Sequence, residues 1–252
     1  LAGRSVNCRY TRENLEAMMS SRVDSTRAVG LAIGQAKRPP PLWLQMSTAT
    51  IYAHRLDAAN DEATGIIGGS EPDVPAYWGY SVEIAKAWER TQEEATTPAT
   101  RKVALRTAMV MSPDREGIFD VLLKLTRWGL GGSVGGGRQF VSWIHERDFV
   151  RAVELLIARE DLSGPVNLAA PGPLPQGEFM AVLRAAWGRK LGLPAMKWMA
   201  EIGAFAMRTD TELLLKSRRV VPGRLLEAGF AFDYSDWATA ARELVLRSRA
   251  LP

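Results

Sequence analysis

Short apolar runs alternate with segments of helical periodicity along most of the chain. A strand–helix–strand repeat of this kind folds into a parallel sheet with right-handed crossovers, so the alternation predicts an α/β fold. The expected strands, compact apolar runs bounded by turn residues, lie at 42–46, 103–110, 140–144 and 166–169. The expected helices, in which apolar residues recur at helical spacing, lie at 13–36, 80–94, 118–128 and 148–159. Thr11 and Asp148 are the expected N-caps of the first and the last of these helices.

From Gln176 onward the pattern is mainly helical. The candidate helices of this part lie at 176–187, 198–207, 224–228 and 235–249. The change of pattern predicts a smaller, mainly helical lobe at the C-terminus. We therefore expect a sheet-containing domain over residues 1–165 and a C-terminal lobe on the substrate side over residues 166–252.

The composition limits the classes of function that the chain can have. The 32 Lys and Arg are scattered among 28 Asp and Glu, which predicts a solvated surface and not a stripe that binds nucleic acid. One cysteine and two histidines exclude an internal disulfide and a Cys- or His-based metal cluster. No apolar stretch reaches the roughly 18–20 residues that span a bilayer, and no signal-peptide pattern is seen. We expect a cytoplasmic protein that binds no metal, membrane or nucleic acid.

Small and hydroxyl-bearing residues stand at the ends of two expected strands. Ligands of an open parallel sheet bind beyond the carboxyl ends of its strands. Leu1, Ala2 and Gly3 would let a flat cofactor approach the backbone, and a plain tight turn is the alternative. Ser47 and Thr48 are suited to donate to a substrate oxygen, and capping of the following turn is the alternative. Because the chain starts on apolar, small residues, we also expect a segment upstream of it.

Tyr80 begins an expected helix and is a candidate general acid or base. A nearby cation would lower the tyrosine pKa from about 10, and a lysine four residues later would lie on the same helix face. That position is Ile84. Lys86 lies about 240° further round the helix and points elsewhere, while Glu83 would oppose the shift. An ordinary packed tyrosine is the alternative.

A glycine-rich stretch covers residues 129–137. A dinucleotide-binding loop needs a strand before it and a helix directly after it, whereas the expected strand at 140–144 follows this stretch. We predict a flexible loop over a binding cleft, with a structural turn as the alternative. His145 beyond it fits a hydrogen-bonded structural histidine better than a catalyst.

Several segments, taken in order, resemble the extended short-chain dehydrogenases/reductases. The likeness is closest to the epimerase-like branch that ends in a helical extension of unknown function (DUF1731-type). The matching pieces are Leu1-Ala2-Gly3 and residues 21–22, 47–52, 88–89, 105–110, 136–145, 164–167, 218–225 and 229–230. Each piece is weak by itself, and their order makes the resemblance specific.

The resemblance implies a Rossmann-like domain that binds NADP or NAD, with a C-terminal lobe closing over a small polar substrate, possibly a sugar nucleotide. By this resemblance the catalytic residues would be Ser47, Thr48 and Tyr80. The cofactor-binding residues would be Leu1, Ala2, Gly3, Arg106, Ala108, Met109 and Val110, and the substrate-side residues Trp143 and His145. A homodimer built from the helices at 13–36 and 80–94 is common in the family.

Two departures from the family bear on activity. The glycine-rich phosphate loop and the strands before it are absent from this chain, and such a loop places the pyrophosphate on a helix N-terminus. Ile84 stands where the family has a lysine. We expect an NAD(P)-dependent oxidoreductase or an isomerase of the nucleotide-sugar epimerase kind. The alternative is a catalytically weak or inactive member that binds a cofactor or a partner.

Overall fold

The computed structural model describes residues 3–6, 8, 10–72, 74–195 and 212–250. Its centre is a parallel sheet in the order β1 (Leu42–Thr48), β2 (Arg101–Thr107) and β6 (Gly164–Leu168). β1 pairs with β2 along its whole length, and β2 pairs with β6. The predicted α/β class with a parallel sheet is confirmed.

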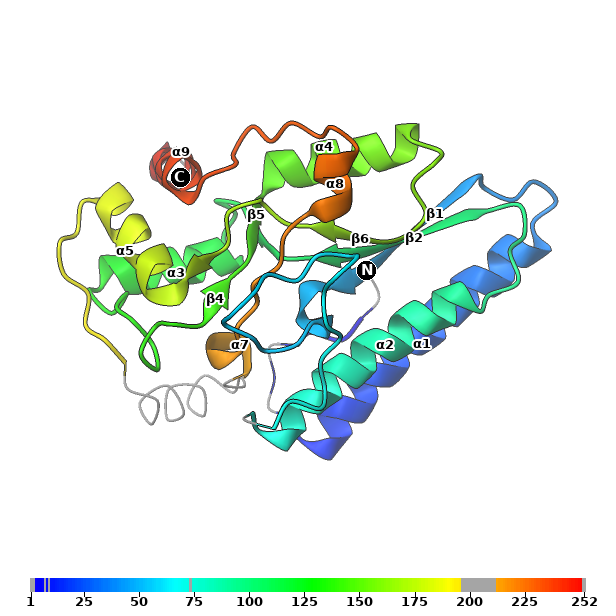
Figure 1. Ribbon diagram of the computed structural model, residues 1–252, viewed down its shortest axis with the longest axis horizontal. Coiled ribbons are helices and arrows are strands. Elements are labelled where there is room, and N and C mark those ends of the chain that lie inside the picture. The colour runs from blue at the N-terminus through cyan, green and yellow to red at the C-terminus, as the bar shows by residue number, and fades with distance from the viewer. Residues whose placement is uncertain (1–2, 7, 9, 73, 196–211, 251–252) are drawn as a thin grey trace.

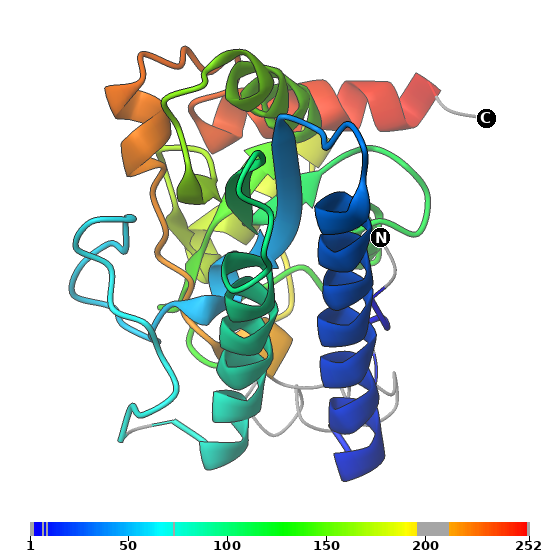
Figure 2. The same ribbon diagram turned by 90° about the vertical axis from the view of Figure 1, so that its right-hand side faces the viewer.

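Helices cover both faces of this sheet, as parallel strands require. On one face α1 (Arg12–Gln35) and α2 (Gly79–Glu93) run side by side (Figure 2). On the other face lie α4 (Glu146–Ala158) and the short α8 (Gly223–Glu227) (Figure 1). The core beneath α4 and α8 contains Val103, Leu105, Ile144, Ala152, Leu156, Val166 and Leu225.

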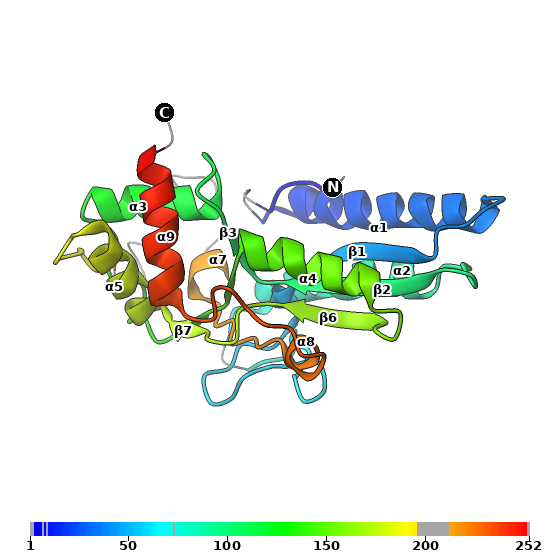
Figure 3. The same cartoon turned by 90° about the horizontal axis from the view of Figure 1, so that it is seen from above.

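A second group of elements packs beside the carboxyl end of the sheet (Figure 3). It consists of the helices α3 (Ile118–Arg127), α5 (Gln176–Trp187) and α9 (Trp237–Ala250) and the short strands β3 (Met109–Met111), β4 (Phe140–Val141), β5 (Trp143–His145) and β7 (Leu174–Pro175). β3 pairs with β5 in parallel and β4 pairs with β7 antiparallel. The ring of Trp237 stacks on Phe179 at 4.1 Å between centroids and contacts Trp143, which gives this group its own aromatic core.

Three short elements connect these parts. The turn of 3-10 helix η1 (Ala49–Ile51) follows β1, η2 (Ala76–Trp78) leads into α2, and α7 (Glu212–Leu215) precedes α8. α7 has no counterpart among the predicted helices, and the helix predicted at 198–207 lies outside the described residues. The predicted boundary at residue 165 falls within β6, and the division into two domains stays a prediction.

Two predicted strands are each divided in the structure. The run 103–110 ends its pairing with β6 at Thr107 and then switches partner, because Met109 begins the pairing with β5. The run 140–144 is divided at Ser142, which is buried. Its hydroxyl donates to the carbonyl oxygen of residue 218 and accepts the N–H of residue 220, so this side chain ties the segment before α8 to the sheet.

The two predicted helix caps had different outcomes. Thr11 caps α1, since its side chain accepts the N–H of Asn14. The prediction for Asp148 was wrong, because His145 is the N-cap of α4 and accepts the N–H of Arg147. Asp148 is fully buried and instead accepts the backbone N–H groups of residues 233 and 234. It therefore ties the segment before α9 onto α4.

Within the described part of the chain, no helix combines the length and apolar character needed to cross a membrane. The same residues hold no cluster of three or more His, Cys, Asp or Glu side chains suited to a metal ion.

Candidate functional site

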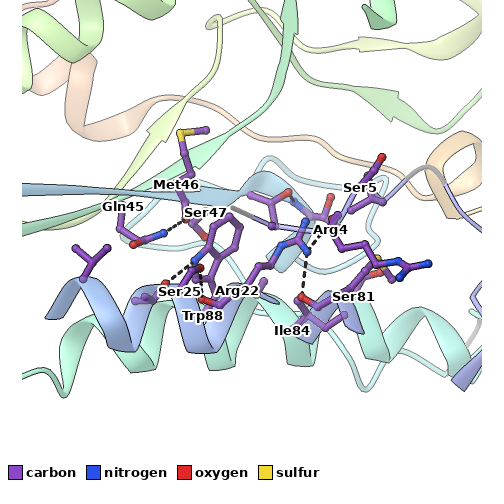
Figure 4. Close-up of a pocket in the computed structure, with 18 of the residues that line it drawn as sticks. Arg4, Ser5, Arg22, Ser25, Gln45, Met46, Ser47, Ser81, Ile84 and Trp88 are labelled. Carbon is purple, nitrogen blue, oxygen red and sulfur yellow. Dashed lines mark hydrogen bonds between the residues drawn. The ribbon is translucent and has the colours of Figure 1, made fainter. Parts of the chain in front are cut away.

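A cavity of about 740 Å³ lies between β1, the two helices α1 and α2, and the N-terminal segment (Figure 4). α1 contributes Arg22 and Ser25 to its wall, and the N-terminal segment contributes Gly3, Arg4 and Ser5. Ser47 and Thr48 at the carboxyl end of β1 line it, where ligands of parallel sheets bind. The volume falls in the range of about 300–1,000 Å³ that is usual for small-molecule sites.

The helix α2 presents one face to this cavity. Ser81, Ile84, Ala85 and Trp88 recur at helical spacing and all line the wall. This periodicity is visible in the sequence and marks Ser81, which is not among the predicted site residues. Ile84 is 7% exposed, so an apolar side chain occupies the position where the family has a lysine.

The hydroxyls of Ser47 and Thr48 have different partners. Ser47 Oγ donates to Glu89 Oε1 at 2.5 Å. Thr48 Oγ1 accepts the N–H of Thr50 at 3.1 Å and caps η1. The capping alternative considered from the sequence therefore describes Thr48, although both residues also line the cavity.

Two arginines carry the charge of the cavity wall. Among its described lining residues Arg4 and Arg22 are charged, and none is Asp or Glu. Arg22 lies 5.1 Å above the ring of Trp88 and donates to the carbonyl oxygens of residues 4 and 18. Burial lowers the pKa of Arg22 from its ordinary value. A guanidinium keeps its charge in all ordinary conditions, so the wall is cationic.

Tyr80, the predicted acid or base, does not line this cavity. Its side chain is 55% exposed at the start of α2, beside Ser81. Lys86 pairs with Glu83 at 2.8 Å on the surface, as its helical position predicts. The catalytic role of Tyr80 stays a prediction.

The predicted cofactor-binding residues fall into two groups. Gly3 lines the cavity, whereas Leu1 and Ala2 lie outside the described residues. Arg106 and residues 108–110 do not line it.

Arg106 forms a buried pair with Glu89 through two hydrogen bonds of 2.9 and 2.8 Å. It also donates to the hydroxyl of Tyr52 at 3.0 Å. Burial opposes the charge of Arg106, but the Glu89 carboxylate outweighs burial and raises the arginine pKa above its ordinary value. These contacts give Arg106 a structural role between β2 and α2.

The predicted substrate-side residues are fully buried away from the cavity. Trp143 donates through Nε1 to the carbonyl oxygen of Gly172 at 3.1 Å. His145 Nε2 lies 3.0 Å from a carboxylate oxygen of Glu243, and its ring stacks on Tyr234 at 3.9 Å. The substrate roles of Trp143 and His145 stay predictions, and the structural role of His145 matches the simpler interpretation of the sequence.

The fold and the cavity together define a Rossmann-like α/β protein with a cationic cavity that follows the edge strand β1 from Trp43 to its carboxyl end at Thr48. Residues 197–244 match the family model DUF1731, described as a domain of unknown function. The chain is 27% identical over 97% of its length to the epimerase family protein YfhF of Bacillus subtilis and spans 76% of that protein. It is 34% identical over 75% of its length to the epimerase family protein MT2273 of Mycobacterium tuberculosis and spans 64% of it.

The solved structures that are similar to this chain indicate the same family as these relatives do. The human epimerase family protein SDR39U1, solved with NADPH, superposes with a TM-score of 0.86 at 26% identity, over 98% of this chain and 80% of that one. A nucleoside-diphosphate sugar epimerase from Corynebacterium glutamicum shares the fold with a TM-score of 0.73 at 24% identity, over 98% of this chain and 45% of that one. The chain belongs to the epimerase-like branch of the extended short-chain dehydrogenases/reductases, with a DUF1731 segment at its C-terminus.

Proposed function

We propose that the cavity binds NADP or NAD and that the protein transfers hydride between this cofactor and a small polar substrate such as a sugar nucleotide. The proposal depends on one observation, the cationic cavity that follows β1 and reaches the carboxyl end of that strand. The human relative named above was solved with NADPH, and a solved neighbour of the same fold was described in complex with UDP-glucose and NAD.

The residues present fit a dinucleotide. Arg4 and Arg22 supply positive charge for phosphate groups, and Ser5 and Ser25 add hydroxyls beside them. Gly3 packs closely against Arg22 at the wall, since an added Cβ would lie 3.3 Å from the Arg22 side chain. The ring of Trp88, over which the Arg22 guanidinium lies at 5.1 Å, adds an aromatic side chain to the wall.

The chain's own residues would hold and orient the reactants. When bound, the nicotinamide supplies or accepts the hydride. Thr48 Oγ1 already accepts a backbone N–H, so among the described residues its own hydroxyl proton is available to a substrate oxygen. Tyr80 remains the proposed acid or base by family resemblance, although it does not line the cavity.

A catalytically weak, cofactor-binding protein is the second candidate. The buried Ile84 favours it, because no cation from that position lowers the pKa of a tyrosine or holds a ribose. A cytoplasmic location and a homodimer also stay predictions from the sequence.

Nicotinamide absorbance tests the proposed activity. The protein is mixed with NADPH or NADP and a panel of UDP-sugars and their keto forms, and absorbance near 340 nm is followed. Turnover that falls at least about tenfold in Thr48→Val supports hydride transfer at this site. Tight NADPH binding without turnover favours the second candidate, and absence of NADPH binding rejects both.

A further inference from the structure

Three segments without acidic residues belong to the helix group beside the sheet. They are residues 121–135, 179–195 and 244–250, and they contain seven Lys or Arg and no Asp or Glu. The whole chain, by contrast, has 32 basic and 28 acidic side chains. The three segments include the carboxyl ends of α3, α5 and α9, which lie at one end of the molecule (Figure 3). Charges that are mixed along the sequence as a whole are therefore separated here.

Side-chain contacts join the three segments to one another. The Arg127 guanidinium lies 5.4 Å from the ring centroid of Trp187, and the Arg249 guanidinium lies 4.5 Å from the same ring. Arg249 also donates to the carbonyl oxygen of Trp187 at 2.9 Å. Arg189 donates to the carbonyl oxygen of Arg127 at 2.9 Å. The three segments therefore lie side by side, and we call the surface that they form the basic end.

Several cations of the basic end have no acidic partner. Lys124 pairs with Asp120, and Arg247 pairs with Glu243. The exposed cations that form no salt bridge with a described Asp or Glu are Arg127, Arg189, Lys190 and Arg249. Their positive potential therefore extends into the solvent and attracts a negatively charged partner.

The most exposed large apolar side chains of the described residues belong to the same three segments. Leu191 is 84% exposed, Trp128 72%, Leu193 66% and Leu246 65%. The N–H of Leu193 donates to the carbonyl oxygen of residue 129 at 2.8 Å, which brings the loop with both of its leucines beside Trp128. Apolar side chains that are exposed singly are normal, whereas their gathering marks an interaction site. The basic end therefore combines unpaired cations with exposed apolar groups.

We propose that the basic end is a docking surface for an anionic lipid bilayer. Negatively charged headgroups match the four unpaired cations, and each cation near such a surface raises the affinity about fivefold. Leucine side chains transfer favourably into the acyl region. A tryptophan ring is suited to the boundary between headgroups and hydrocarbon. None of these side chains lines the cavity, so the docking surface is separate from the site of the proposed function.

The apolar part of the basic end favours a bilayer over nucleic acid. Nucleic acid would pair its phosphates with the cations and stack a base on Trp128, but it would leave the leucines in water. Contact with a bilayer surface needs no spanning helix, and the described residues contain none. The expectation from the sequence that no membrane is bound rests on the absence of a spanning stretch, and it does not bear on contact at the surface.

Co-sedimentation with vesicles tests the proposal. The full chain is mixed with vesicles of phosphatidylcholine alone, or with vesicles of equal parts phosphatidylcholine and phosphatidylglycerol. We expect binding to the anionic vesicles to be at least about tenfold tighter than binding to the neutral vesicles at low salt. The difference should shrink as the salt concentration rises, because salt screens exposed charges.

A pair of charge variants tests the cations. Arg189→Glu combined with Lys190→Glu should weaken binding to the anionic vesicles at least about tenfold. Lys37→Glu combined with Arg38→Glu is the matched control, since it makes the same change of net charge at exposed positions after α1. The control should bind within about threefold of the unaltered protein, because its charges lie away from the docking surface.

A second set of variants tests the apolar groups. Trp128→Ser combined with Leu191→Ser should weaken binding to the anionic vesicles at least about tenfold. Ile157→Ser, at a position on α4 that is 57% exposed, is the matched control and should not change binding. All these positions are exposed, so the variants should keep the thermal midpoint of the unaltered protein.

Three results would overturn the proposal. The first is equal binding to neutral and anionic vesicles, or no binding to either. The second is an equal loss of binding in the charge variant of the basic end and in its control, because the attraction would then follow net charge and not this surface. The third is capture by soluble polyglutamate without binding to vesicles, which would assign the basic end to an acidic protein.

Discussion

Replacing Arg106 by methionine should destabilise the fold strongly while leaving the cavity wall in place. The change removes both hydrogen bonds to Glu89 and the bond to the Tyr52 hydroxyl. The Glu89 carboxylate, whose side chain is only 15% exposed, then keeps the hydrogen bond from the Ser47 hydroxyl. Breaking a buried pair by removing one partner costs about 3–5 kcal/mol. At roughly 2–4 °C per kcal/mol for a chain of this size, the midpoint of thermal unfolding should fall by about 6–20 °C.

Urea unfolding of matched variants measures this effect. The double variant with Glu89→Leu and Arg106→Met should recover most of the loss, since no buried charge is left alone. Arg12→Met breaks an exposed pair with Glu16 and should leave stability unchanged within error. A loss below about 1 kcal/mol in Arg106→Met would refute the structural role. Weaker NADPH binding without lost stability would instead favour the cofactor role expected from the family.

The remaining predictions concern three other positions. Burial lowers the pKa of His54, and its neutral ring accepts the N–H of Ser217 at 2.9 Å. Below pH 6.5 the unfolded chain therefore binds more protons at this histidine than the folded chain does. The free energy of unfolding should fall as the pH decreases through that region. His54→Asn, which keeps an acceptor, should flatten this slope in unfolding measured across pH. Asp148→Ala leaves two backbone N–H groups of the segment before α9 without their acceptor and should cost about 1–3 kcal/mol in urea unfolding. Gly132→Ala should lower the thermal midpoint, because its Cβ would lie 2.4 Å from the carbonyl oxygen of Leu193; an unchanged midpoint would show that this loop shifts without cost.

The elements with strong periodicity could be predicted from the sequence. The helix expected at 13–36 is Arg12–Gln35, and the one expected at 176–187 is Gln176–Trp187. The strand at 42–46 is extended by two residues in β1. The local pattern of apolar residues is enough to predict these elements, because each helix buries one continuous apolar stripe, and each strand one apolar run, against a neighbouring layer of the fold.

The features that were predicted wrongly or missed depend on contacts between segments that are distant in the sequence. Asp148 is of a residue type, and at a position, typical of a helix cap. Its carboxylate instead accepts backbone N–H groups from a segment about 85 residues later in the chain. The four-residue helix α7 is too short to show a period, so neither it nor the hydrogen bond between Ser81 and Glu212 could be seen. Ser81 itself was within reach, because positions 81, 84, 85 and 88 share one helical face.

Calorimetric titration with NADPH tests the central claim most directly, because the cationic cavity must bind a dinucleotide if the account holds. The protein and its Arg22→Met variant are titrated at the same salt concentration. We expect one site per chain in the unaltered protein and an affinity at least about tenfold weaker in the variant, which corresponds to about 1.4 kcal/mol. Equal affinity in both proteins would place the cofactor elsewhere, and no binding to either would contradict the account.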